Sequence, residues 1–135
     1  MSDDDRRQLQ DVMLSYAAAV DELDMARYRA CFTDDVEIVG FGEETVHGAD
    51  NWVASVASQL EAFSATQHLL GPQLATVSGD TATTRSDVQA MHVLKNTDGK
   101  MLTLWATYKT AFVRTEAGWK IARHELVPRH LQQSD

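Results

Sequence analysis

Two long runs of alternating side chains, joined by a tight turn, constrain the fold of this chain most strongly. Residues 81–94 and residues 101–115 each alternate between polar and apolar side chains, which predicts two long strands. Between them, Asn96-Thr97-Asp98-Gly99 is typical of a hairpin turn. An isolated hairpin is only marginally stable, so the rest of the chain must cover one face of it.

The remaining segments predict helices and shorter strands. Apolar residues recur at helical spacing in residues 9–23 and 49–63, and a short helix is expected over Met25–Phe32. The other expected strands are Val36–Val39, Thr45–His47, Thr66–Val77 with an interruption at Pro72, and Trp119–Arg123. This order predicts an α+β fold in which helices pack on one face of a curved antiparallel sheet and enclose a pocket.

Length and composition indicate one globular domain over residues 1–135, with frayed ends at about residues 1–5 and 129–135. The net charge is −8 and lysine and arginine form no cluster, which argues against nucleic acid as a partner. No apolar run approaches the roughly 18 residues of a membrane span. Residues 1–7 lack the apolar core of a secretory signal, and the single Cys31 cannot form an internal disulfide. We therefore expect a cytoplasmic protein with no membrane partner.

The segment Thr66-Gln67-His68-Leu69-Leu70-Gly71 carries the candidate chemistry. Alternation along a strand puts His68 and Leu70 on one face, so a buried Leu70 implies a buried imidazole that needs a partner. The candidate partner is Asp21, on the flank of the first apolar helical stripe. Its carboxylate would orient the ring for use as a general base. The alternative is a core histidine bonded only to a backbone carbonyl.

Alternation along the two long strands predicts which other side chains face the same interior. In residues 81–94 it places His92 inward, and in residues 101–115 it places Tyr108 inward, on the face opposite Lys109. The further residues expected around the pocket are Leu70, Ala90, Leu104, Ala106 and Phe112 as apolar wall, with Trp52 and Val56 closing its mouth.

Arg123 and the remaining histidines complete the set of candidate site residues. Counted from Trp119, alternation places Arg123 inward, where it would bind an anionic group of a substrate; the alternative is an ion pair with a carboxylate such as Glu125 or Asp87. We expect no metal site, because no two of the five histidines have the i,i+4 spacing of a helical zinc site and no cysteine cluster is present. His124 and His130 are expected at the surface or in the tail.

Several motifs in this order resemble the SnoaL-like branch of the NTF2-like superfamily, over about residues 9–123. The motifs are Tyr16-x4-Asp21-x2-Asp24, Phe32-Thr33-Asp34-Asp35, Gly48, Thr66-Gln67-His68 and Gly118-Trp119-Lys120-Ile121. The resemblance implies the cystatin-like fold, a cone-shaped curved antiparallel sheet that encloses a pocket with three helices. Within the superfamily, the sequence is most similar to scytalone dehydratase and hexachlorocyclohexane dehydrochlorinase.

The resemblance also implies roles for individual residues. His68 corresponds to the general base, Asp21 to the residue that orients it, and His92 to a second catalytic histidine. Tyr108 corresponds to a pocket asparagine; His92 and Tyr108 would donate hydrogen bonds to developing negative charge. Tyr16 corresponds to the first-helix tyrosine of ketosteroid isomerase.

Two functions follow from this reading. The first is a cofactor-free lyase of the dehydratase type, or an isomerase, that acts on a small, partly apolar cyclic or polyketide-like substrate. The second is a non-catalytic domain for small-ligand binding or association, in which the Asp21–His68 pair only satisfies buried polar groups. In either case the resemblance implies a homo-oligomer, a dimer or a trimer.

Overall fold

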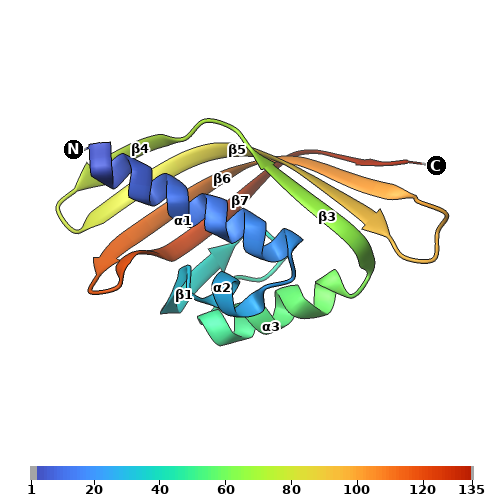
Figure 1. Cartoon of the computed structure of the whole chain (residues 1–135), viewed down its shortest axis with the longest axis horizontal. Coiled ribbons are helices and arrows are strands. Elements are labelled where there is room, and N and C mark those ends of the chain that lie inside the picture. The colour runs from blue at the N-terminus through green and yellow to red at the C-terminus, as the bar shows by residue number, and fades with distance from the viewer. Residues whose placement is uncertain (1–2, 135) are drawn as a thin grey trace.

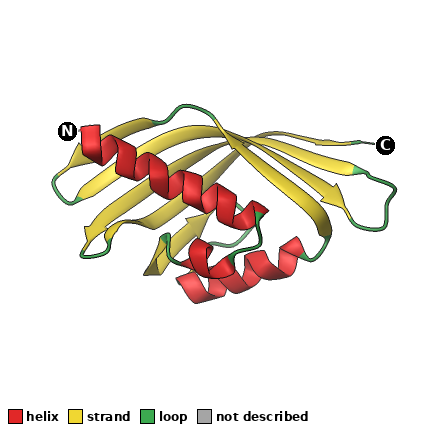
Figure 2. Cartoon of the chain, in the orientation of Figure 1, coloured by secondary structure: helices red, strands yellow, loops and turns green. Residues whose placement is uncertain are grey.

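The computed structural model describes residues 3–134 and shows three helices on one side of a curved, seven-stranded sheet (Figures 1 and 2). The helices are α1 (Asp3–Asp21), α2 (Met25–Arg29) and α3 (Ala49–Leu60). The strands are β1 (Phe32–Val39), β2 (Val46–His47), β3 (Phe63–Leu70), β4 (Leu74–Ser78), β5 (Thr81–Leu94), β6 (Met101–Thr115) and β7 (Gly118–Gln133). The sheet order is β2-β1-β7-β6-β5-β3, and β4 pairs with β5 beyond the end of β3. The predicted α+β architecture is confirmed.

The predicted hairpin forms the centre of the sheet. β5 and β6 pair antiparallel without a register shift, from Thr81 opposite Val113 to Val93 opposite Met101. Because this register is unbroken, the inward side chains of both strands alternate as predicted, and Val88, Ala90, Tyr108 and Phe112 are buried.

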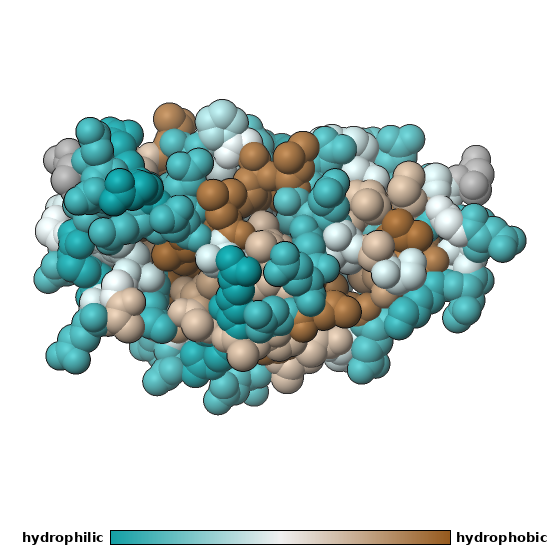
Figure 3. Space-filling view, viewed as in Figure 1, coloured by the Kyte–Doolittle hydropathy of each residue, from teal (hydrophilic) through white to brown (hydrophobic). Residues whose placement is uncertain are grey.

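Helix α1 covers the sheet with one apolar stripe. Leu9, Met13, Tyr16 and Val20 are buried and recur at helical spacing. The opposite side of α1 is exposed, and hydrophilic residues cover much of the face seen in Figure 3, with hydrophobic residues in separate patches. No helix within residues 3–134 is long and apolar enough to span a membrane.

The beginning of the sheet differs from the prediction in two respects. The short second helix ends at Arg29 and not at Phe32, and β1 starts at Phe32, four residues before the predicted strand start at Val36. β1 also pairs with β7 in parallel, from Phe32 opposite Ile121 to Val39 opposite Glu125, so the sheet is not wholly antiparallel. This pairing was not visible in the local sequence because β1 and β7 lie far apart in the chain.

The last strand of the sheet differs from the prediction more than the first strand does. A strand was predicted only over Trp119–Arg123, followed by a frayed tail; β7 instead runs to Gln133 and stays paired with β6. Pro128, which cannot donate to a ladder, lies directly before an extra residue in β7, where the register shifts between the pairs Ala106–Pro128 and Trp105–His130. Residues 1, 2 and 135, which belong to the predicted frayed ends, lie outside the described residues.

A second extra residue in β7 reverses the predicted orientation of Arg123. Phe112 pairs with Ile121, but Ala111 pairs with Arg123, so Ala122 bulges. A shift of one residue sends each following side chain to the other face. Arg123 therefore points outward and donates to Glu37 Oε1 at 2.8 Å and Glu125 Oε1 at 3.3 Å, so its predicted substrate-binding position is wrong and the ion pair with Glu125 is present.

Gly40, directly after β1, allows the chain to approach β7 closely. Its φ is +86°, and an added Cβ would clash with the backbone oxygen of Leu126. The next residue, Phe41, packs against Trp52, with ring centroids 4.9 Å apart. Gly40 therefore fixes the approach of the loop that carries Phe41.

We predict that Gly40→Ala lowers the free energy of unfolding by about 3 kcal/mol or more, because strain at a positive φ adds to a clash with backbone. Gly99→Ala is the matched control: its φ is +83° and nothing lies within 4 Å of the added Cβ, so it should cost only about 1 kcal/mol. Urea unfolding of both variants measures the difference. Equal losses of unfolding free energy in the two variants would show that the close approach of Gly40 to Leu126 adds nothing to the cost of the substitution.

Candidate active site

The Asp21 carboxylate binds β3 through three hydrogen bonds. His68 Nδ1 lies 2.8 Å from Asp21 Oδ1, the backbone N–H of His68 donates to Oδ2 at 2.8 Å, and the Thr66 hydroxyl donates to Oδ1 at 3.0 Å. Asp21 is the last residue of α1, while Thr66 and His68 lie on the same face of β3. The predicted contact between Asp21 and His68 is therefore confirmed. The alternative, a core histidine bonded only to a backbone carbonyl, is not observed.

This contact determines the proton positions on the His68 ring. An ionised carboxylate only accepts hydrogen bonds, so Nδ1 carries the proton that points to Asp21. In the neutral ring, Nε2 then has a free lone pair. The His68 side chain is only 10% exposed, and His68 lines a cavity between the helices and the sheet. The pair can therefore present a base to a ligand in the cavity.

The same bonds keep Asp21 ionised. Burial alone would raise the pKa of Asp21, but the hydrogen bonds from the His68 ring and backbone and from Thr66, together with the charge of the ring, outweigh it. The net result is a pKa below the ordinary value of the carboxyl group.

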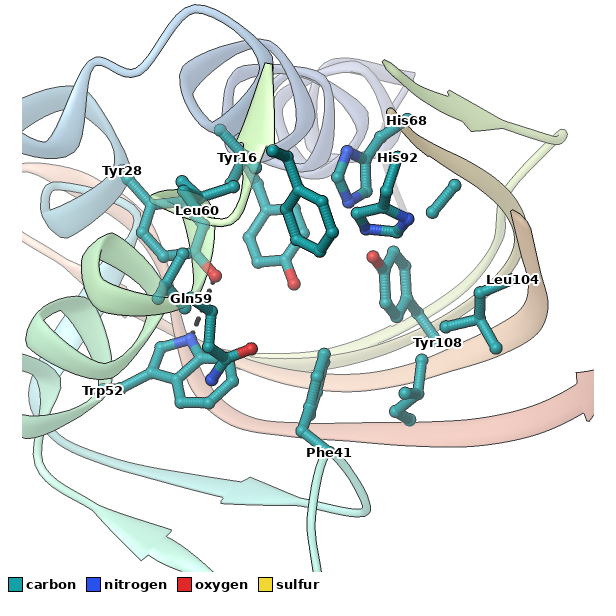
Figure 4. A pocket seen from close by; sticks show the side chains of 15 residues that line it. Tyr16, Tyr28, Phe41, Trp52, Gln59, Leu60, His68, His92, Leu104 and Tyr108 are labelled. Atoms are coloured by element: carbon teal, nitrogen blue, oxygen red, sulfur yellow. Dashed lines mark hydrogen bonds between the residues drawn. The ribbon is translucent and has the colours of Figure 1, made fainter. Parts of the chain in front are cut away.

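The cavity beside His68 has a volume of about 210 Å³ and lies between the helices and the inner face of the sheet (Figure 4). Its walls are mostly aromatic and aliphatic, and no lysine, arginine, aspartate or glutamate lines it. The lining residues are Tyr16, Val20, Tyr28, Phe41, Trp52, Val56, Gln59, Leu60, Phe63, His68, Ala90, His92, Leu104, Tyr108 and Leu126. Such walls suit an uncharged, partly apolar ligand.

Most of the predicted pocket residues meet at this cavity. The structure brings together Tyr16, Trp52, Val56, His68, Ala90, His92, Leu104 and Tyr108. Leu70 and Phe112 do not line it: Leu70 packs against the core opposite Val88, and Phe112 is fully buried opposite Ala82. Ala106 is buried outside the lining as well.

His92 has a different hydrogen-bonding role from the predicted one. Its Nδ1 lies 3.3 Å from the backbone oxygen of Leu102, and a carbonyl only accepts, so Nδ1 carries the proton. Burial, followed by the nearby His68 ring, lowers the pKa of His92 and favours the neutral form. Neutral His92 therefore offers an acceptor at Nε2 and not the predicted donor. Its ring centroid is 5.8 Å from that of His68.

Hydroxyl groups gather at the same cavity. The chain has three tyrosines, Tyr16, Tyr28 and Tyr108, and all three line it. Trp52 Nε1 donates to the Tyr28 hydroxyl at 2.9 Å, and the centroid of the Tyr16 ring lies 5.1 Å from that of Tyr28 and 5.6 Å from that of Tyr108. Burial raises the pKa of Tyr108 to about 12 and also raises the pKa values of Tyr16 and Tyr28. The phenols therefore stay protonated and able to donate.

His124 was missed by the prediction, which placed it at the surface or in the tail. It is fully buried, with Nε2 2.9 Å from the Tyr16 hydroxyl and Nδ1 2.9 Å from the Thr110 hydroxyl. The bulge at Ala122 turns it inward, as it turns Arg123 outward. Alternation counted backward from the apolar Leu126 would have placed His124 correctly.

No group of three or more histidine, cysteine, aspartate or glutamate side chains in residues 3–134 is arranged to hold a metal ion. His47 and His130 are exposed, and Cys31 is buried with its Sγ 3.5 Å from the backbone oxygen of Arg27. Burial raises the pKa of Cys31 to about 11, so the thiol is protonated and no nucleophile is available there.

Known proteins share both the sequence pattern and the fold. The model of the SnoaL-like domain family matches residues 2–125. No protein among the curated sequences matches the chain. Among solved structures, a candidate aromatic ring hydroxylase from Novosphingobium aromaticivorans is similar, with 31% sequence identity, a TM-score of 0.88, and coverage of 99% of this chain and 96% of that one.

Two further solved structures are similar at lower identity. A candidate scytalone dehydratase from Novosphingobium aromaticivorans has 22% identity and a TM-score of 0.87, covering 96% of this chain and 87% of that one. A hexachlorocyclohexane dehydrochlorinase from Novosphingobium barchaimii has 19% identity and a TM-score of 0.84, covering 98% and 94%. The predicted NTF2-like, cystatin-like fold is confirmed.

The lowered pKa of Asp21 predicts an acid dependence of stability. A carboxyl group whose pKa is lower in the folded state stabilises the fold above its unfolded pKa of about 4, and this contribution is lost as the pH falls through the folded value. We expect the free energy of unfolding to fall less steeply below pH 4 in Asp21→Asn than in the unaltered protein. Asp11→Asn, an exposed position on the same helix, should leave the acid slope nearly unchanged. Urea unfolding between about pH 2 and pH 6 tests this; identical slopes for all three proteins would contradict it.

Proposed function

We propose, from the premise that the chain belongs to the SnoaL-like domain family, that it is a cofactor-independent lyase of the dehydratase type or an isomerase. The observation that carries the proposal is the Asp21–His68 pair, whose Nδ1–H points to the carboxylate and whose ring lines an uncharged cavity. Two similar structures carry names that denote eliminations, a dehydratase and a dehydrochlorinase.

In the proposed reaction, His68 Nε2 takes a proton from a carbon of the substrate. In a lyase, the electron pair of the broken C–H bond forms a double bond as the leaving group departs from the adjacent carbon. In an isomerase, the pair is held in an enolate until the imidazolium returns the proton to another carbon. Asp21 stabilises the imidazolium, because its charge lies 2.8 Å from Nδ1.

The walls of the cavity define the substrate class. Without a charged side chain to pair with, a phosphate or carboxylate group would lose its hydration with little compensation. Aromatic rings from Phe41, Trp52 and Phe63 instead favour a cyclic, largely apolar molecule. The tyrosine hydroxyls would bind its oxygen atoms and stabilise an enolate as it forms.

We predict that the protein catalyses exchange of the protons next to the carbonyl of 1-indanone in D₂O, followed by ¹H NMR. This reaction requires only a base and a site that stabilises the enolate, so it does not depend on knowing the natural leaving group. His68→Ala should lower the rate by roughly 10²–10⁴-fold, because general-base catalysis has that magnitude. Asp21→Asn should lower it as well, and the double variant should be little slower than His68→Ala, because the two residues act as a unit.

His47→Ala is the matched control, since His47 is exposed and outside the cavity. Its exchange rate should equal that of the unaltered protein. Binding of 1-indanone without any accelerated exchange would favour the second function, a non-catalytic small-ligand-binding domain. Exchange that survives His68→Ala would assign the base to another residue.

A further inference from the structure

His124 is a buried titratable side chain that lies behind the cavity and that the proposed reaction does not use. Its ring packs against Tyr108, with centroids 4.6 Å apart, and against Tyr16, at 4.9 Å. It joins Thr110 of β6 to Tyr16 of α1 through its two ring nitrogens. It touches the tyrosine cluster from behind without itself lining the cavity.

The ring is neutral and therefore carries a single N–H. Burial lowers the pKa of His124 to about 3, and no acidic side chain is bonded to it. Either Nδ1–H donates to Thr110 and Nε2 accepts from Tyr16, or Thr110 donates to Nδ1 and Nε2–H donates to Tyr16.

The surroundings of Thr110 distinguish the two arrangements. Thr110 is buried, and within residues 3–134 its hydroxyl is hydrogen-bonded to His124 alone. If Nδ1 carried the proton, the Thr110 hydroxyl would accept it and leave its own buried proton without an acceptor. An unsatisfied buried donor costs about 1–3 kcal/mol. The favourable arrangement therefore has Thr110 donating to Nδ1 and His124 donating from Nε2.

The protonation of His124 decides whether the Tyr16 hydroxyl proton is available to the cavity. Tyr16 lines the cavity, and its hydroxyl lies 2.9 Å from His124 Nε2. If Tyr16 donated to His124, this proton would be used and none would remain on Tyr16 for a ligand. Because His124 donates to Tyr16 instead, the Tyr16 proton stays free at the cavity.

We propose that His124 is a positioning residue: by donating from Nε2 to Tyr16, it leaves the Tyr16 hydroxyl free to donate to a carbonyl oxygen of the ligand. The inference deepens the proposed function, because that oxygen is where negative charge develops when His68 removes a neighbouring proton. Thr110 acts indirectly, because its hydroxyl determines which nitrogen of His124 is protonated. The cavity then selects ligands with an acceptor oxygen over hydrocarbons of the same shape.

The first test is the protonation of the His124 ring in the unaltered protein. Long-range ¹H–¹⁵N correlation spectra at neutral pH distinguish the two ring nitrogens, and His124→Gln assigns the signals. We expect the proton on Nε2. A proton on Nδ1 would overturn the inference.

The second test compares two probes, 1-indanone and indane, which differ in one carbonyl oxygen, with binding followed by NMR titration. Thr110→Val removes the hydroxyl that fixes the His124 ring but does not alter the cavity lining, and Thr110→Ser retains the hydroxyl. We expect Thr110→Val to weaken the binding of 1-indanone by roughly three- to tenfold and to leave the binding of indane unaffected. Thr110→Ser should preserve both affinities. Equal weakening of both probes by Thr110→Val would show a merely structural role and overturn the inference.

Neither test depends on turnover. If His68 is not the base, exchange is absent or survives His68→Ala, while the His124 proton and the preference for the ketone remain. If the inference is wrong, those two fail while the exchange that depends on His68 remains. If Thr110→Val does not fold, the position of the His124 proton in the unaltered protein still decides.

Discussion

The site depends first on the way in which one carboxylate ends a helix and binds a strand. Asp21 accepts three hydrogen bonds from Thr66 and from the ring and backbone of His68, and so connects the end of α1 to β3. A carboxylate has about four lone-pair sites, so these bonds compensate most of the cost of partial burial. Because one of the donors is the His68 backbone, the ring and the main chain are held together. The geometry of the base is thus part of the packing between helix and sheet.

The character of the cavity also depends on a β-bulge in β7. The bulge at Ala122 changes the face of every following residue in β7, so that His124 enters the interior and Arg123 leaves it. The outward arginine pairs with Glu37 and Glu125, which keeps a cation away from the cavity. The inward histidine is buried in neutral form and bonded on both nitrogens. One extra residue therefore makes the cavity uncharged and adds the support behind Tyr16.

The two sides of the cavity differ in hydrogen-bonding character. His68 and His92 both have Nδ1 bonded to an acceptor outside the cavity, so each presents an acceptor nitrogen as a neutral ring. The tyrosine cluster receives donors from Trp52 and, by our inference, from His124, and so presents a donor. A ligand that loses a proton on one side and gains negative charge on the other suits this division. The dimer or trimer that the family resemblance implies stays a prediction.

The sequence by itself determined whatever depends on short-range periodicity. The helical stripe of α1 and the alternation of β5 and β6 correctly predicted the fold class and the inward positions of Tyr16, His92 and Tyr108. The need of a buried His68 for a partner pointed to Asp21, and the resemblance added the roles of the two residues, which no local pattern could bring together. Tertiary structure alone decided the rest: the parallel pairing of β1 with β7, the continuation of β7 to Gln133, and the bulge at Ala122. A bulge is a property of two paired strands, because an extra residue exists only relative to a partner. The orientation of Arg123 and His124 was therefore undefined until β6 and β7 were paired.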